Sequence, residues 1–265
     1  MTTAEPMLQL DTATREAVAE LLLGVADDEF VIGFWDSEWT GIAPMLEEDV
    51  AMSSIAQDEI GHARALYELL AELTDEDADR IAFGREPDAF RHAALLNHPR
   101  RDWAFTVARR YLYDTADAVR QEALAHGSWP PLAGLAAKMR REETYHLLHM
   151  DAWIRRLAEA GGDARARLEA SLKRLWPDAQ TVFTPLPGEQ ALLAAGVLVA
   201  PLEELRGRWL ERTVAALASL RLPVPGAEER AAIPPVDGRT RRTDDFRWLH
   251  GEFTMVARSQ EGATW

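Results

Sequence analysis

The sequence contains no cysteine among its 265 residues. Disulfides, thiolate nucleophiles, cysteine-based zinc sites and iron–sulfur clusters are therefore excluded. A chain without disulfides fits an intracellular protein, and we expect a cytoplasmic location. The stretch from Met1 to Leu10 has no positive charge followed by an apolar run, so the sequence predicts no signal peptide.

Long apolar runs and excess positive charge are also missing. The longest apolar stretch, Ala191 to Leu202, is too short to cross a bilayer as a helix, so we expect no membrane association. Lys and Arg number 29 against 44 Asp and Glu, which gives a formal net charge of −15. Nucleic-acid binding needs clustered cations, so this charge balance predicts no nucleic-acid partner. The sequence also has no phosphate-binding glycine motif and no Gly-x-Ser-x-Gly nucleophile elbow.

Helical periodicity dominates the first 160 residues, where Ala, Leu, Glu and Arg are abundant. Gly41 and Pro44 mark a first turn, residues 127–131 mark another, and a longer connection spans residues 74–101. Two antiparallel hairpins joined by one long crossover are typical of an all-α, ferritin-like four-helix bundle. The four helices are predicted at Thr12–Trp39, Pro44–Leu73, Asp102–His126 and Pro130–Ala160.

A C-terminal extension follows Gly161-Gly162, a glycine pair that predicts the end of the fourth helix. Proline-rich segments separate its helices, which we expect to be shorter than those of the bundle. We predict a single ferritin-like domain over residues 1–265, with the core bundle at about 12–160 and the extension at about 163–265. The helices of the extension are predicted at Ala164–Trp176, Ala200–Leu220 and Asp244–Val256.

Two segments of the bundle repeat the pattern Glu-x-x-His. Glu59 with His62, and Glu143 with His146, fall on one face of their helices because side chains three apart in an α-helix are neighbours. Bundle di-iron proteins take such a motif from each of two helices and one carboxylate from each of the other two. Carboxylates bridge and charge-balance the metal ions, and imidazole supplies a neutral nitrogen ligand.

Glu29 is the matching carboxylate of the first helix. In an antiparallel hairpin, residues equidistant from the turn lie side by side, and the sequence midpoint of Glu29 and Glu59 is Pro44, in the turn. Glu38 fails this test, because its midpoint with Glu59 falls inside the second helix. Apolar residues flank Glu29 at helical spacing, and a carboxylate on an apolar stripe is costly to bury without a compensating cation.

Asp114 is the matching carboxylate of the third helix. Its midpoint with Glu143 falls in the turn at residues 128–129, so each carboxylate lies about 15 residues, roughly 22 Å, from its turn. Arg110, Asp117 and Gln121 share the Asp114 face, and Asp117 is an alternative ligand. The predicted site holds two iron ions, with manganese as the alternative metal, at six residues: Glu29, Glu59, His62, Asp114, Glu143 and His146.

Other charged residues leave alternatives open. Asp58 and Glu142 each precede a candidate ligand, and they are either solvated or support the histidines. His149 follows the second motif, and we expect it at the surface or beside the site. Just before the last predicted helix stands an arginine cluster, for which we expect a solvated loop, with contact to an anionic ligand as the alternative: Arg239, Arg241 and Arg242.

At these residues the chain resembles the oxygenases of aromatic CoA thioesters, in particular subunits of phenylacetate-CoA oxygenase (phenylacetyl-CoA 1,2-epoxidase). The overall pattern is closest to the C-type subunit, which packs against the catalytic A-type subunit. C-type members commonly carry Gln in place of the second-helix histidine, whereas this chain keeps all six ligand positions, as the catalytic subunit does. The resemblance rests on residues 37–39, 43–44, 46–49, 58–64, 111–114 and 142–146, and on Trp265.

The resemblance implies a di-iron subunit of a multicomponent oxygenase that attacks the ring of an aromatic acyl-CoA in phenylacetate catabolism. Its partners would be a homologous oxygenase subunit and a separate reductase, because nothing in the sequence indicates a flavin or iron–sulfur site. Two other functions stay open. One is a non-catalytic subunit that positions a catalytic partner, and the other is a ferritin-like iron store, which the extra C-terminal helices disfavour.

Overall fold

A computed structural model describes residues 10–259 of the chain. Over this range it contains ten α-helices, three short 3₁₀ helices and no strand, so the predicted all-α fold is confirmed. Trp265 and the segment Met1 to Gln9 lie outside the described residues. The long helices are α1 (Thr12–Ser37), α2 (Leu46–Thr74), α4 (Trp103–Leu124), α5 (Pro130–Ala160), α6 (Gly162–Ala179), α8 (Leu202–Ser219) and α10 (Asp244–Ser259).

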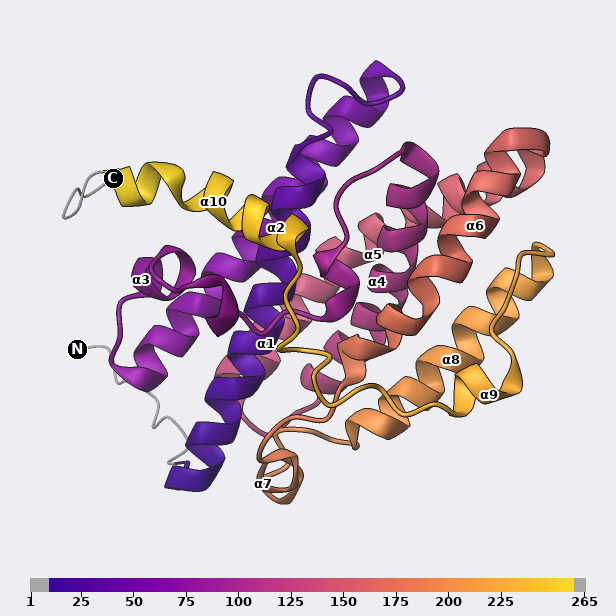
Figure 1. Cartoon of the computed structure of the whole chain (residues 1–265). Coiled ribbons are helices and arrows are strands. Elements are labelled where there is room, and N and C mark those ends of the chain that lie inside the picture. The colour runs from indigo at the N-terminus through magenta and orange to yellow at the C-terminus, as the bar shows by residue number, and fades with distance from the viewer. Residues whose placement is uncertain (1–9, 260–265) are drawn as a thin grey trace.

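Helices α1, α2, α4 and α5 form the predicted bundle of two hairpins. Helix α1 packs along α2, α4 packs along α5, and α2 also contacts α5 (Figure 1). Side-chain caps start two of these helices: Asp11 accepts a hydrogen bond from the Thr14 amide, and Asp102 accepts one from the Phe105 amide. The predicted bounds agree with the structure to within two residues at each end.

One glycine allows the first hairpin to close tightly at the level of the predicted site. A Cβ atom added at Gly33 of α1 would lie 2.9 Å from Ile60 Cγ1 and 3.0 Å from Glu59 Cβ, both on α2. Such distances are shorter than side-chain packing permits, so a larger residue at position 33 would push the two helices apart. The close approach of α1 and α2 brings Glu29 and Glu59 together.

The crossover and the extension cover the bundle and are more helical than the sequence indicated. Helix α6 packs on α4 and α5, α8 packs on α4, and α10 lies across α1 and α3 (Figure 1). Periodicity missed the short elements because a single helical turn carries too few residues to show a pattern. These elements are α3 (Ala78–Phe83), α7 (Glu189–Ala194), α9 (Ala227–Ala231), η1 (Pro87–Ala89), η2 (Ala94–Asn97) and η3 (Gln180–Phe183).

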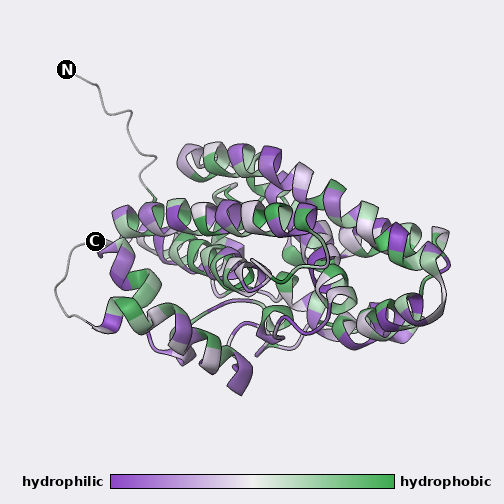
Figure 2. Cartoon of the chain, turned by 90° about the horizontal axis from the view of Figure 1, so that it is seen from above, coloured by the Kyte–Doolittle hydropathy of each residue, from purple (hydrophilic) through white to green (hydrophobic). Residues whose placement is uncertain are grey.

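One continuous cluster of buried apolar residues runs from Ala17 in α1 to Phe253 in α10. The helices carry both hydrophilic and hydrophobic residues along their length, as the hydropathy colouring shows (Figure 2). Within residues 10–259, none of the helices combines the length and the hydropathy that a membrane crossing requires. The single domain over residues 1–265 stays a prediction.

The expectation of a solvated arginine loop is wrong for Arg239. This side chain is buried, and its guanidinium pairs with Asp28 of α1 at 3.0 Å while donating to the backbone carbonyl of Val182 at 2.8 Å. The physical reason is that Asp28 is itself fully buried and requires a cation close by. A loop sequence shows no periodicity from which such burial could be read.

Candidate metal centre

The six predicted residues come from all four bundle helices and are all buried. Glu29 belongs to α1, Glu59 and His62 to α2, Asp114 to α4, and Glu143 and His146 to α5. The most exposed of them retains only 4% of its accessible surface. The carboxylates that the sequence placed at equal distances from the two turns therefore lie at one buried level of the bundle.

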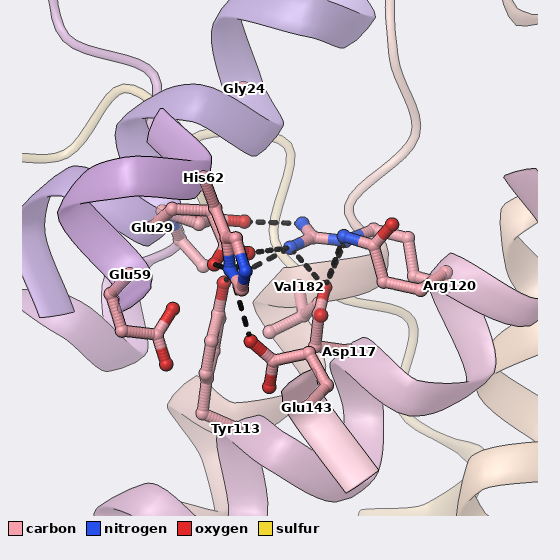
Figure 3. A network of polar contacts seen from close by, with 12 residues as sticks. Gly24, Glu29, Glu59, His62, Tyr113, Asp117, Arg120, Glu143 and Val182 are labelled. Atoms are coloured by element: carbon pink, nitrogen blue, oxygen red, sulfur yellow. Dashed lines mark hydrogen bonds and ion pairs between the residues drawn. The ribbon is translucent and has the colours of Figure 1, made fainter. Parts of the chain in front are cut away.

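Four of these residues form a compact group: Glu29, Glu59, His62 and Glu143. Each offers one ligand atom, and these atoms all lie within 4.8 Å of one another. His62 Nδ1 lies 3.4 Å from Glu29 Oε2 and 3.3 Å from Glu143 Oε1. Figure 3 shows the side chains of Glu29, His62 and Glu143 pointing toward one another. Three carboxylates and one imidazole in this arrangement could hold a metal ion.

His146 joins the group from the α5 side. Its Nδ1 lies 3.4 Å from Glu59 Oε1 and 3.3 Å from Glu143 Oε1. Glu143 therefore faces both histidines, whose ring centroids are 6.4 Å apart. A carboxylate in this central place could contribute to holding a metal ion together with either imidazole.

A carboxylate outside the cluster contacts the far nitrogen of each imidazole. His62 Nε2 donates to Glu142 Oε2 at 2.7 Å, and His146 Nε2 donates to Asp58 Oδ2 at 3.1 Å. An outer carboxylate of this kind fixes the tautomer and leaves Nδ1 facing the cluster. The sequence left two roles open for Asp58 and Glu142, and the structure agrees with the second, because each of them contacts a histidine of the cluster. His149 instead pairs with Glu48 at 2.9 Å.

Asp114 is buried beside the compact group but interacts with an arginine. Arg110 Nη2 lies 2.8 Å from Asp114 Oδ1, and Arg110 Nη1 lies 2.5 Å from Glu59 Oε1. Arg110 is fully buried, so these charges are shielded from water. Its place one helical turn before Asp114 was visible in the sequence, but the contact with Glu59 of another helix was not.

Asp117, the alternative ligand, is held by a second buried arginine. Arg120 Nη2 lies 2.5 Å from Asp117 Oδ1, and the same nitrogen donates to the Tyr113 hydroxyl at 3.1 Å. The Tyr113 hydroxyl in turn donates to Glu29 Oε1 at 2.8 Å, as Figure 3 shows from close by. This chain of contacts orients Glu29. The role of Tyr113 was not evident from spacing, because its partner Glu29 lies on α1.

Burial acts to raise the pKa of each carboxyl group in the cluster, but neighbouring charges and hydrogen bonds give the net pKa shifts opposite directions. Burial and the neighbouring Glu59 and Asp117 raise the pKa of Glu29 well above 4.5. Burial is the largest effect on Glu59 and acts to raise its pKa, but the Arg110 guanidinium together with hydrogen bonds from Glu29 and His146 holds that pKa well below 4.5. Burial and the charges of Glu143 and Glu59 raise the pKa of Asp114 well above 3.8 despite Arg110. Closely packed acids that cannot all ionise together are typical of functional sites.

A pocket of about 480 Å³ reaches Glu143 from the outside, between α4, α5 and α8. Its walls are largely apolar, and two arginines, Arg140 and Arg212, also line it. Arg212 pairs with Glu122, another lining residue, at 3.2 Å. The volume is within the range of small-molecule sites, so a ligand of moderate size can approach the buried cluster here.

The whole chain, residues 1–265, matches the family described as phenylacetic acid catabolic protein. It is 31% identical over 204 residues to the C-type subunit of 1,2-phenylacetyl-CoA epoxidase from Escherichia coli (strain K12), and the match covers 77% of this chain and 82% of that subunit. It is 26% identical over 231 residues to the A-type subunit of the same enzyme and organism, and this match covers 84% of this chain and 74% of that subunit.

Proposed function

The chain belongs to the phenylacetic acid catabolic protein family, and from this premise we propose that it is a metal-bearing subunit of a multicomponent oxygenase acting on an aromatic acyl-CoA. Phenylacetyl-CoA is the proposed substrate, because both relatives are subunits of an epoxidase of that compound. Iron is the proposed metal, with manganese as the alternative, since carboxylate and imidazole ligands suit both.

The observation that carries this proposal is a set of buried lone pairs without hydrogen-bond partners in the described part of the chain. Glu29 Oε2, Glu59 Oε2 and both oxygens of Glu143 are buried and accept no hydrogen bond there. Acceptors buried in this way are costly unless a cation compensates them. The two histidine Nδ1 atoms face the same space, so the donors present fit a metal ion chemically.

The six residues divide into two overlapping sets. Glu29 and His62 would form the outer ligands on one side, Asp114 and His146 those on the other, and Glu59 and Glu143 belong to both. Reduced iron in such a centre supplies dioxygen activation. The chain itself supports the ligands: Tyr113 holds Glu29, and Glu142 and Asp58 hold the histidines.

The pocket beside Glu143 is the proposed substrate site. Its apolar walls, which include Val119 and Leu147, suit an aromatic ring and exclude water from it. The guanidinium groups of Arg140 and Arg212 would meet the anionic CoA portion, because arginine pairs well with phosphate oxygens. Electrons would come from a separate reductase, and a homologous oxygenase subunit would complete the complex.

A second candidate function is a non-catalytic subunit that positions the catalytic one. The observation that favours it is Arg110, whose contacts with Glu59 and Asp114 neutralise part of the cluster within the chain itself. In this case the complex would retain its epoxidase activity when the cluster is removed. The two functions therefore differ in one measurable property, the dependence of activity on the cluster residues.

Elemental analysis of protein from iron-supplied cells tests the metal-bearing function directly. Bound iron is expected in the wild-type chain and is expected to be lost in the variant Glu59→Ala/His62→Ala, which removes one ligand motif. The same variant should abolish epoxidation of phenylacetyl-CoA by the complex with its partner subunit and reductase. Full epoxidase activity of the variant complex would establish the non-catalytic function instead.

The substrate site is tested by filling the pocket. Ala118 lines it from α4, so Ala118→Trp is expected to weaken phenylacetyl-CoA binding at least tenfold by calorimetry. Ala137→Trp is the matched control, because this residue is exposed on α5 and is not among those that line the pocket. Equal affinity in Ala118→Trp and the wild type would place the acyl-CoA elsewhere.

A further inference from the structure

Arg110 occupies one side of the acidic cluster. Its side chain is fully buried, and its two terminal nitrogens lie 2.5 Å from Glu59 Oε1 and 2.8 Å from Asp114 Oδ1. Asp36 of α1 lies 3.3 Å from the same guanidinium. Three carboxylates therefore surround one permanent cation at the edge of the proposed metal centre.

The two ligand sets of the centre are unequal for this reason. Glu29, Glu59, His62 and Glu143 bring four ligand atoms within 4.8 Å of one another. On the other side, Asp114 has its Oδ1 beside Arg110, and the shared Glu59 has its Oε1 beside the same arginine. A metal ion at the second set would have to share both carboxylates with a guanidinium.

We infer that Arg110 is a built-in cation that takes the charge-balancing place of a second metal ion, so that the chain holds one metal ion tightly, at Glu29, Glu59, His62 and Glu143. This inference rests on the metal centre proposed above and narrows it. The centre would be asymmetric, in contrast to the paired site that the repeated Glu-x-x-His motif predicts.

Electrostatics and packing both keep Arg110 in place. A guanidinium does not lose its proton in proteins, so it cannot become neutral to admit a second ion. Moving it out would leave Asp36 Oδ2 and Asp114 without this cation in a region closed to water. A second divalent ion would instead lie close to a like charge, which weakens its binding.

The neighbouring Arg109 provides a matched control. It is also fully buried on α4, and it also pairs with Asp36, at 2.9 Å. Its other contact is the backbone carbonyl of His98, which accepts a hydrogen bond from it at 2.8 Å. Replacing Arg109 therefore removes a buried charge next to Asp36 without removing the cation from Glu59 and Asp114.

The test is a titration of the metal-free full-length chain with Mn²⁺, followed by equilibrium metal analysis and electron paramagnetic resonance. The wild type is expected to bind one equivalent tightly, with the spectrum of an isolated ion. Arg110→Gln is expected to bind a second equivalent at least tenfold more tightly than the wild type does, with the spectrum of an exchange-coupled pair. Arg109→Gln and the charge-preserving Arg110→Lys are expected to keep one equivalent.

Each contrary result overturns a distinct claim. Two tight equivalents in the wild type, or a second equivalent in Arg110→Gln that is no tighter, would overturn the role of Arg110 and leave the metal centre intact. No Mn²⁺ or Fe²⁺ binding by the wild type would overturn the metal centre itself, and the role of Arg110 with it. If Arg110→Gln does not fold, the number of Mn²⁺ ions that the wild type binds tightly decides the question. One ion supports the role of Arg110, and two ions contradict it.

Discussion

Each imidazole in the cluster depends on a carboxylate that is itself outside the cluster. The Glu142 side chain is 40% exposed, yet it accepts the hydrogen bond from His62 Nε2. With Nε2 committed in this way, Nδ1 faces Glu29 and Glu143. The partly exposed Glu142 therefore orients the buried imidazole of His62, as outer carboxylates do for the histidines of metal sites.

We expect Glu142→Gln to weaken metal affinity about 10- to 100-fold, because the loss of an outer partner of a ligating histidine has this effect. Fe²⁺ or Mn²⁺ affinity measured by calorimetry checks it. Glu68→Gln is the control, since Glu68 lies on the surface of α2, pairs with Arg64 and undergoes the same change of charge. Similar affinities in the two variants would show that Glu142 does not support His62.

His92 is a buried histidine away from the cluster. It is fully inaccessible, its ring packs against Phe246, and its Nε2 lies 3.0 Å from Asn97 Oδ1. Burial, assisted by the positive charge of Arg242, lowers the pKa of His92 well below 6.5. The folded protein therefore keeps this imidazole neutral at a pH where the unfolded chain protonates it.

Acidification below pH 6.5 is accordingly expected to destabilise the protein through His92. The unfolded state then binds a proton that the folded state does not, which lowers the free energy of unfolding by up to about 1.4 kcal/mol per pH unit. His92→Gln removes the titration and can still donate to Asn97. Between pH 7 and 5, urea unfolding should show a steeper loss of the free energy of unfolding in the wild type than in His92→Gln. Equal losses in the two proteins would contradict this expectation.

At the scale of the helices, the bundle could be predicted because it is built from long periodic segments. The start of α5 at Pro130 and its end before Gly161 follow from residues whose backbone preferences are strong. Helix α6 was predicted too short, because it continues through Pro177 to Ala179. Proline often ends a helix, so the continuation depends on tertiary packing that local sequence does not report.

The contact between the extension and α1 was also beyond prediction, and it is expected to be energetically important. Arg239 lies 211 residues from Asp28 in the chain and meets it inside the protein. Burial acts to raise the pKa of Asp28, but Arg239 and Arg120 together lower it below 3.8, which indicates a strongly paired carboxylate. Breaking such a pair leaves a buried charge poorly compensated.

Arg239→Met is therefore expected to cost about 3–5 kcal/mol of the free energy of unfolding. Arg241→Met is the matched control, because Arg241 is 46% exposed and pairs with Asp178 at the surface. An exposed pair contributes only about 0–1 kcal/mol, so the control should unfold at nearly the wild-type urea concentration. Equal losses in the two variants would show that the buried pair is no more important than the surface one.

For the whole molecule, the distances from the two turns and the Glu-x-x-His motifs predicted that six residues from four helices lie at one level. They could not show how the charges of these residues are balanced. Equal distance from a turn is a property of the chain, so Glu29 and Glu59 could be matched from sequence alone. The contact of Arg110 with Glu59 joins a side chain of α4 to one of α2 inside the bundle, and side-chain direction across helices is not encoded in spacing.

The outer face of α2 and α5 is the expected surface for a partner subunit. Two large apolar side chains three residues apart on α5 are exposed, Tyr145 at 73% and Leu148 at 60%. The contact between Glu48 and His149 joins the two helices at this face. Exposed apolar groups near polar contacts are typical of protein interfaces, in which tyrosine often contributes strongly to binding.

Tyr145→Asp is expected to weaken binding of the homologous oxygenase subunit at least tenfold, because it replaces an aromatic contact with a charge that must lose water on binding. Titration of the purified partner followed by calorimetry measures the change. Val199→Asp is the control, since Val199 is 48% exposed but belongs to neither α2 nor α5 and lies in the turn before α8. If Val199→Asp weakens the complex and Tyr145→Asp does not, the partner binds the C-terminal extension and not the face of α2 and α5.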